Sequence, residues 1–174
     1  MHRISKTFEC DYGHRVHNQT LNIDYSMDDC LVCRHLHGHR MQVAVVLEAE
    51  ELTNNMVQDF KHLNWFKDFI DTVVDHKFII DRNDPMFEVV TGKKLADIRY
   101  TEYQGATFGY LELGNDLLHN EILESFVIVD FVPTSEELSK WFFTIVEERM
   151  KPLGVKVSSI SFKETPKSEA VYHG

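Results

Sequence analysis

Apolar and polar residues alternate in two segments within the first fifty positions. Between Ile4 and His14 the side chains at even positions share one face of an extended segment, because neighbouring residues of a strand point to opposite sides. Between His37 and Glu50 the odd positions share a face, and this segment is rich in β-branched residues. The pattern predicts two strands, separated by a polar loop over residues 18–36.

Two later segments have the spacing of three and four residues that is typical of helices. The first follows the capping candidates Thr53 and Asn54, and its apolar residues are Phe60, Leu63, Phe66, Ile70 and Val73. The second opens with Thr134 and Glu137, which have the spacing of a capping box. Each segment is expected to form a helix of several turns.

The remaining apolar runs are short and rich in aromatic or β-branched residues. Ile98–Tyr103 and Thr107–Leu113 flank a turn that contains glycine, which predicts a hairpin. Ser125–Phe131 and Val155–Thr165 predict two more strands, and Glu164 lies on the apolar face of the last one. The expected order is strand, strand, helix, inserted hairpin, strand, helix, strand.

Composition narrows the classes of protein that this order fits. A chain of 174 residues with 43% hydrophobic content can form one domain, here 1–174 with an insertion at about 82–124. It has no apolar run near the roughly 18 residues of a membrane helix and no signal-peptide core. Three cysteines are too few for a disulfide framework, so we expect a cytoplasmic protein without a membrane partner.

Charge bears on the partners of the chain. The net charge of -10 argues against a nucleic-acid partner, because phosphate backbones are bound by clustered Lys and Arg. A small anionic substrate remains compatible with the sequence, since Arg15, Arg34, Arg40 and Lys163 flank the candidate site residues.

Histidines supply the clearest candidate chemistry. His37 and His39 begin a predicted strand and point to one side of it, with Gly38 between them allowing close approach of neighbouring backbone. His14 ends the neighbouring strand on the same predicted face, and three histidines with an open position are a common catalytic zinc arrangement. A structural zinc site of Cys30, Cys33 and the His37/His39 pair is the alternative that spacing leaves open.

The residues around this pair resemble a known motif. Cys33-Arg34-His35-Leu36-His37-Gly38-His39 is similar to the C-x-x-x-H-G-H motif of the 6-carboxy-tetrahydropterin synthases, within the wider 6-pyruvoyl-tetrahydropterin synthase family. Further similarities follow in order: Phe8-Glu9 with His14-Arg15, Asp59-Phe60, Asp75-His76, Pro133-Thr134-Ser135-Glu136 and Lys163-Glu164-Thr165. The three-residue gap after Cys33 favours the carboxy type, because pyruvoyl-type enzymes usually have a longer one.

The resemblance implies an activity and a role for each site residue. Such enzymes convert 7,8-dihydroneopterin triphosphate and water to 6-carboxytetrahydropterin, acetaldehyde and triphosphate, on the route to queuosine. It implies Zn²⁺ on His14, His37 and His39, with Cys33 as proton acceptor. It also implies His76, polarised by Asp75, as a proton relay, Glu164 as the anchor of the pterin ring, and ring contacts from Thr134 and Ser135.

The resemblance implies a fold as well. This is the α+β tunnelling fold, an antiparallel four-stranded sheet with two helices on one face, here with the inserted hairpin. Such chains assemble through trimers into homohexamers, with active sites between subunits. Residues 82–124 depart from the family's short connection. Another pterin reaction on the same scaffold, such as 6-pyruvoyl-tetrahydropterin formation or cleavage of the dihydroneopterin side chain, and a noncatalytic zinc-stabilised module remain alternatives.

Overall fold

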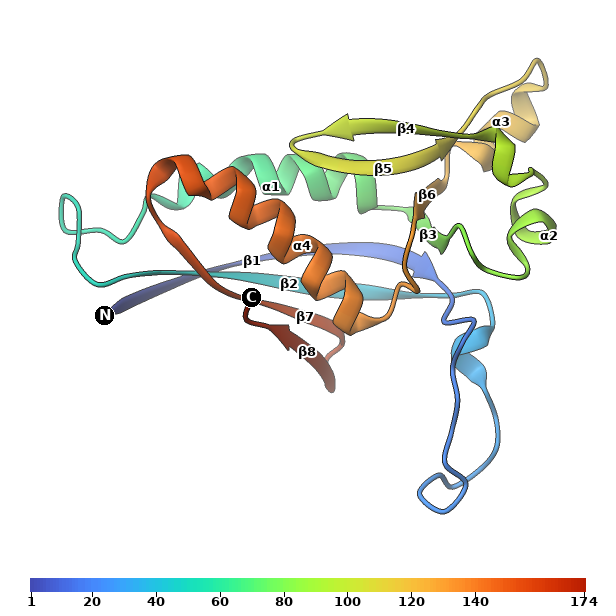
Figure 1. The fold of residues 1–174 in the computed structure, drawn as a ribbon, viewed down its shortest axis with the longest axis horizontal. Coiled ribbons are helices and arrows are strands. Elements are labelled where there is room, and N and C mark those ends of the chain that lie inside the picture. Colours follow the sequence, from blue (N-terminus) through green and yellow to red (C-terminus); the bar gives the residue numbers. More distant parts are fainter.

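The computed structural model describes residues 1–174, arranged around an eight-stranded sheet of order β4-β5-β6-β3-β1-β2-β7-β8 (Figure 1). The strands are β1 (His2–His14), β2 (His37–Ala49), β3 (Lys77–Asp81), β4 (Ile98–Tyr103), β5 (Ala106–Leu111), β6 (Phe126–Val129), β7 (Lys156–Thr165) and β8 (Ser168–Tyr172). The helices are α1 (Asn64–Phe69), α2 (Phe87–Thr91), α3 (Leu117–Leu123) and α4 (Ser135–Met150). None of them is both long and apolar enough to cross a membrane.

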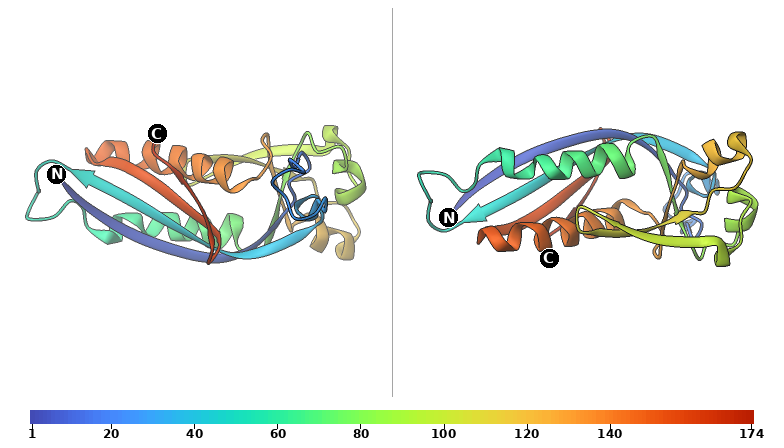
Figure 2. Two further views of the ribbon diagram at one scale, coloured as in Figure 1. Left: turned by 90° about the horizontal axis from the view of Figure 1, so that it is seen from below. Right: turned by 90° about the horizontal axis from the view of Figure 1, so that it is seen from above.

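Four of the strands form an antiparallel block, as the resemblance implied, but its fourth strand is the unpredicted β8 and not the Ser125–Phe131 strand, which pairs with β3 instead. β1 pairs with β2, β2 with β7 and β7 with β8, all antiparallel. Figure 2 shows α1 and α4 lying together against this block. The even positions of β1 and the odd positions of β2 point into the core between sheet and helices, with Tyr12 and Met41 among the buried side chains. The predicted faces of both strands and the α+β class are confirmed.

The sheet itself is larger than expected and mixed. β1 and β3 are parallel neighbours, and so are β3 and β6. The strands β3 and β8 and the short helices α2 and α3 were not predicted. β3 has no alternation of apolar and polar residues because Ile79 packs in the main core while Ile80 packs in a second one. A strand buried on both faces therefore lacks the signal by which β1 and β2 were found.

Helix α1 begins later than predicted. Thr53 does not cap it but pairs with Met56 in a tight turn. The continuous helical segment starts with a 3₁₀ turn over Phe60–Leu63, where the Asp59 side chain accepts a hydrogen bond from Lys61 N. It continues through α1 into a π-helical turn at Ile70–Val74. The capping prediction at Thr53 and Asn54 was wrong, since a side chain nearer the apolar run caps the helix.

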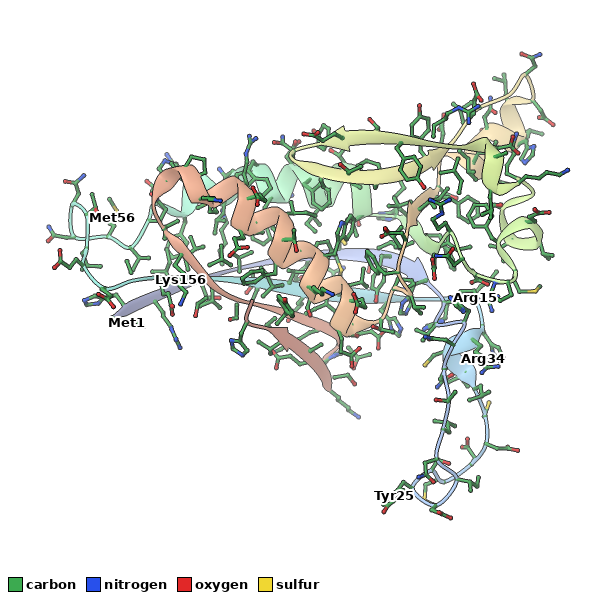
Figure 3. All side chains as sticks on the ribbon, viewed as in Figure 1. Met1, Arg15, Tyr25, Arg34, Met56 and Lys156 are labelled. Carbon is green, nitrogen blue, oxygen red and sulfur yellow. The ribbon has the colours of Figure 1, made fainter.

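The hairpin in the inserted segment is confirmed, and it extends the sheet. β4 and β5 are joined through Gln104 and Gly105, whose φ angles are 55° and 86°, as in a two-residue turn with left-handed residues. The second core, which includes Ile98 and Leu111 of this hairpin, joins side chains of β3 and β6 to Phe87 of α2 and Leu123 of α3. Residues 15–36 project from the opposite side, with Tyr25 near the tip (Figure 3).

Candidate metal and substrate site

Strand pairing places the three predicted histidines together. In the β1–β2 ladder His14 lies opposite His37, and Tyr12 lies opposite His39. The imidazole centroids are 4.5 Å apart for His14 and His37, 5.3 Å for His14 and His39, and 4.9 Å for His37 and His39. One nitrogen from each ring and one oxygen of Glu164 lie within 4.8 Å of one another. The three rings therefore present a group of nitrogens of the kind that holds a metal ion.

Backbone carbonyls orient two of these rings. His14 Nδ1 donates to Pro133 O at 2.7 Å, and His37 Nδ1 donates to His35 O at 2.8 Å. Because a carbonyl oxygen only accepts, each Nδ1 carries the proton and Nε2 keeps its lone pair for a ligand. The Nε2 atoms of His14 and His39 are buried and lack a well-aligned hydrogen-bond partner. Such unpaired buried nitrogens fit a bound metal ion.

Glu164 lies beside the rings at the end of β7. Its Oε1 is 3.1 Å from His14 Nε2 and 3.5 Å from His39 Nε2. Without a metal, a hydrogen bond from His14 with a proton on Nε2 would hold the pKa of this carboxyl below its usual value, although burial opposes the shift. Burial lowers the pKa of His39, against the raising effect of Glu164. The neutral imidazole that a metal requires is thus favoured at His39.

Two paired glycines allow this approach of the strands. Gly13 lies opposite Gly38 in the ladder. A Cβ at Gly38 would stand 2.7 Å from Tyr12 O, and one at Gly13 would stand 2.6 Å from the Phe78 ring. The glycine between His37 and His39 is therefore required by the local packing.

Cys33 lies at the base of the projecting loop, near enough to Glu164 for that charge to act on its thiol. It belongs to a 3₁₀ turn, Val32–Arg34, and its backbone O accepts a hydrogen bond from Val16 N at 2.7 Å. Its side chain is partly buried, and burial together with the Glu164 charge raises the pKa of the thiol. Cys30 is exposed, and neither cysteine joins the metal-binding group. The alternative Cys2His2 zinc site is not assembled in this structure.

The Asp75-His76 pair forms a second, separate group. His76 Nδ1 lies 2.9 Å from Asp75 Oδ2, and Asp75 Oδ1 accepts a hydrogen bond from Asp11 N. Burial raises the pKa of Asp75, but the hydrogen bonds from Asp11 and His76 outweigh it and leave the pKa below its usual value. The ring of His76 is largely exposed. Within one chain this pair does not join the three histidines.

The Pro133-Thr134-Ser135 segment connects the histidines to α4. Thr134 caps the helix, since its hydroxyl accepts a hydrogen bond from Glu137 N at 3.3 Å. Ser135 is the first residue of α4. Because Pro133 O accepts the hydrogen bond from His14, the residue that orients this candidate ligand is adjacent to the cap of α4. Sequence reasoning missed this role of Pro133, since a carbonyl acceptor leaves no trace in the residue type.

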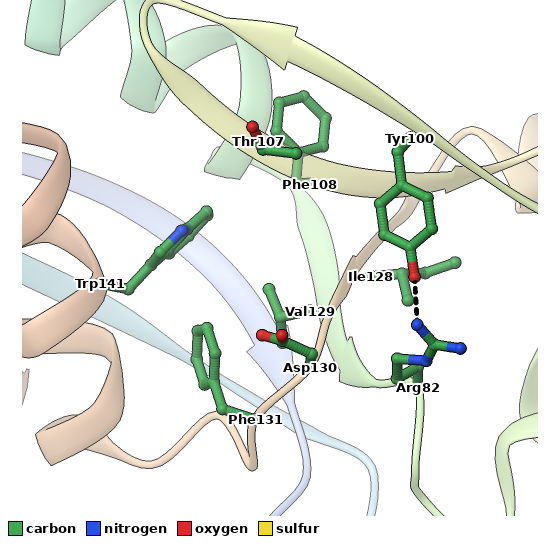
Figure 4. Close-up of a pocket in the computed structure, with 9 residues that line it drawn as sticks. All are labelled: Arg82, Tyr100, Thr107, Phe108, Ile128, Val129, Asp130, Phe131 and Trp141. Carbon is green, nitrogen blue, oxygen red and sulfur yellow. Dashed lines mark hydrogen bonds between the residues drawn. The ribbon is translucent and has the colours of Figure 1, made fainter.

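The candidate site opens into a polar cavity of about 400 Å³. It lies where β2 and β7 diverge beyond the pairing of Gln42 with Lys163. His39 and Glu164 line it, as do the basic residues Arg40 and Lys163. A second cavity, of about 330 Å³, lies between the hairpin and α4 and contains none of the predicted site residues (Figure 4). In it Arg82 Nη1 donates to Tyr100 Oη at 2.7 Å.

Comparison with known proteins gives a consistent result. Residues 3–174 match the family described as 6-pyruvoyl tetrahydropterin synthase. The chain is 33% identical to the 6-carboxy-5,6,7,8-tetrahydropterin synthase of Aquifex aeolicus, over 97% of this chain and 96% of that protein. An uncharacterized protein from Wolinella succinogenes is 47% identical with a TM-score of 0.93, covering 99% of this chain and 98% of that one. The 6-pyruvoyl tetrahydropterin synthase of Caenorhabditis elegans, at 19% identity and a TM-score of 0.56 over 99% and 94% of the chains, is similar in fold.

Proposed function

The chain belongs to the 6-pyruvoyl tetrahydropterin synthase family, and we propose that it is a zinc-dependent 6-carboxy-tetrahydropterin synthase. The substrate would be 7,8-dihydroneopterin triphosphate, which reacts with water to give 6-carboxytetrahydropterin, acetaldehyde and triphosphate. The observation that carries the proposal is the convergence of His14, His37 and His39 beside a polar cavity. The name of the Aquifex relative and the three-residue gap between Cys33 and His37 favour the carboxy product.

His14, His37 and His39 would hold the metal through their ring nitrogens. The buried Nε2 atoms of His14 and His39, which face Glu164 without a well-aligned hydrogen bond, support this assignment. When bound, zinc would act as a Lewis acid on the hydroxyls of the substrate side chain and would favour the thiolate of a nearby cysteine.

Cys33 is the proposed proton acceptor. The protein alone raises the pKa of its thiol, through burial and the negative charge of Glu164. A base in this position therefore needs a compensating positive charge nearby. The partly buried position of Cys33 at the base of the loop leaves the sulfur reachable from solvent.

Glu164 is the proposed anchor of the pterin ring. A carboxylate can accept two hydrogen bonds from the donor edge of a 2-amino-pyrimidinone. A glutamate carboxyl is ionised at neutral pH, as this role requires, and the shift of its pKa is downward, away from neutral pH. Because its oxygen also lies close to two of the histidines, a fourth metal ligand is the competing role. Thr134 and Ser135 would contribute further ring contacts from the start of α4.

Asp75 and His76 would act as the proton relay of a neighbouring subunit's site. In one chain they form a group of their own, away from the three histidines. The two outer strands of the antiparallel block, β1 and β8, have unpaired edges through which copies of the chain could associate. β3 pairs with β1 only at Tyr12–His14, and Asp11 bonds to Asp75 and His76, so no strand pairs with the edge of β1 before Asp11; β8 pairs only with β7. We therefore propose a trimer-based homo-oligomer, a hexamer, whose sheets join at these edges.

A product assay tests the proposed activity. Zinc-loaded protein is incubated with 7,8-dihydroneopterin triphosphate, and products are identified by mass spectrometry. Acetaldehyde with 6-carboxytetrahydropterin is the expected result. Formation of 6-pyruvoyl-tetrahydropterin, or cleavage of a dihydroneopterin side chain, would assign another reaction to the same site. Absence of turnover by protein that binds zinc would favour a noncatalytic zinc-stabilised module.

A further inference from the structure

The inserted segment starts beside the strand that carries His14. Because β1 and β3 are parallel, with His14 next to Ile79, the residues that follow the two strands leave the sheet side by side. Arg15 and His17 follow β1, and Figure 3 labels Arg15 at this point. Asp81 ends β3, and Asp84 follows it in the first turn of the insertion.

Two contacts join these neighbouring segments. Arg15 Nε lies 3.0 Å from Asp84 Oδ2, and His17 Nε2 lies 3.0 Å from Asp81 Oδ2. The exposed fractions are 13% for the Arg15 side chain and 1% for that of Asp84. The Arg15 N–H does not point directly at the oxygen, so this contact is an ion pair rather than a linear hydrogen bond. Removing one partner would leave a buried charge uncompensated.

Each carboxylate also holds its own turn with its second oxygen. Asp81 Oδ1 accepts a hydrogen bond from Asn83 N at 2.9 Å, and Asp84 Oδ1 accepts one from Met86 N at 2.8 Å. The same two side chains therefore fix the first turn of the insertion and attach it to the residues after His14. No other element of the insertion reaches this end of β1 with buried charges.

We propose that Asp81 and Asp84 are positioning residues for metal binding, through which the insertion holds the His14 end of β1. The inference rests on the proposed function, because it assumes that His14 is a metal ligand. The hydrogen bond from His14 Nδ1 to Pro133 O sets the rotation of the ring, and the pairing of β1 with β2 and β3 ends at His14, so that pairing does not hold the backbone that follows. Arg15 and His17, which follow directly, are held by the two aspartates. Partners outside the ligand set commonly tune metal affinity in this way.

The test compares Asp84→Asn with Glu112→Gln. The second variant removes an exposed ion pair with Arg99 in the same insertion and serves as the matched control. Zinc affinity is measured on folded protein by competition with a chromophoric chelator, and the visible spectrum of cobalt(II)-loaded protein reports ligand geometry. We expect Asp84→Asn to weaken zinc binding about 10–100-fold and to alter the cobalt spectrum. Asp84→Glu should recover part of the affinity, and Glu112→Gln should match the native protein.

A purely structural ion pair would give a different result. If folded Asp84→Asn binds zinc within twofold of the native protein with an unchanged cobalt spectrum, the proposal is wrong, whatever its loss of stability. If Asp84→Asn does not fold, His17→Gln breaks the other contact and is judged by the same criteria. A native protein that binds neither metal would overturn the proposed function and this inference together. Native binding that both variants retain would overturn this inference alone.

Discussion

The imidazole of His14 is fully buried, with Nδ1 bonded to Pro133 O and Nε2 lying 3.1 Å from Glu164 Oε1. Replacing it with alanine should abolish tight zinc binding and leave Pro133 O without its donor. We expect His14→Ala to lower zinc affinity at least 100-fold and to cost about 1–3 kcal/mol of folding stability. Chelator competition and urea unfolding measure the two effects, with the exposed His2→Ala as control. Native zinc affinity in His14→Ala would remove it from the ligand set.

Glu164→Gln separates the two roles open to this carboxylate. As a pterin anchor, Glu164 contributes to substrate affinity but not to metal affinity. We expect the variant to bind zinc within a few-fold of the native protein while the KM for the pterin substrate rises at least tenfold, a change that corresponds to about 1.4 kcal/mol. The exposed Glu147→Gln is the control. A large fall in zinc affinity would instead identify Glu164 as the fourth ligand.

Glu48, at the end of β2 far from the histidines, should make the folding stability depend on pH. Hydrogen bonds from Lys156, Ser158 and Arg3 lower its pKa from 4.5 to about 2. A lowered folded-state pKa stabilises the protein above the unfolded-state pKa, and this contribution is lost as the pH falls toward the folded-state value. The urea midpoint of Glu48→Gln should therefore lie below that of native protein at pH 7. The difference should shrink between pH 4.5 and pH 2, and a constant difference would contradict the assignment.

At the scale of elements, the strands and helices that could be predicted from the sequence are those that bury only one face. β1, β2 and α4 each bury one face, so their periodicity was visible and it placed His14, His37 and His39 on one side. β3 is buried on both faces and β8 is short and polar, so neither produced a pattern. The hydrogen bond to the Pro133 carbonyl and the Arg15–Asp84 ion pair could not be predicted from the sequence either. Both depend on which strands become neighbours in the fold. The sequence motif identified Asp75 and His76 as a pair, but it did not show that the pair lies apart from the three histidines within one chain.

The β1–β2 pairing around the paired glycines can be tested directly. A methyl group at position 38 would clash with the backbone of Tyr12, which cannot move without disturbing the ladder. We expect Gly38→Ala to destabilise the protein by about 1–3 kcal/mol and to weaken zinc binding. Gly114→Ala is the control, since nothing lies within 4 Å of its added Cβ. Equal stability and zinc affinity in both variants would show that the close approach at Gly38 is not required.

At the scale of the whole molecule, the free edges of β1 and β8 predict how copies associate. Only alternate N–H groups of β8 face away from β7, so proline at adjacent positions should act differently. Ala170→Pro and Val171→Pro each remove one N–H of β8, and one of the two N–H groups points outward. We expect the variant that loses the outward N–H to be a folded monomer that binds zinc but lacks activity. The other should disturb the β7–β8 ladder. Native mass spectrometry and the product assay measure both outcomes, and full turnover by a verified monomer would contradict assembly of the site between subunits.

The position of the three histidines on one β-hairpin also has a consequence for the order of folding. His14, His37 and His39 can meet as soon as β1 pairs with β2, whereas Glu164 and the Pro133 carbonyl come from the last third of the chain. Contacts close in sequence form with a smaller loss of chain entropy than distant ones. The nitrogen ligands can therefore assemble early, and zinc present during refolding should speed formation of the native sheet.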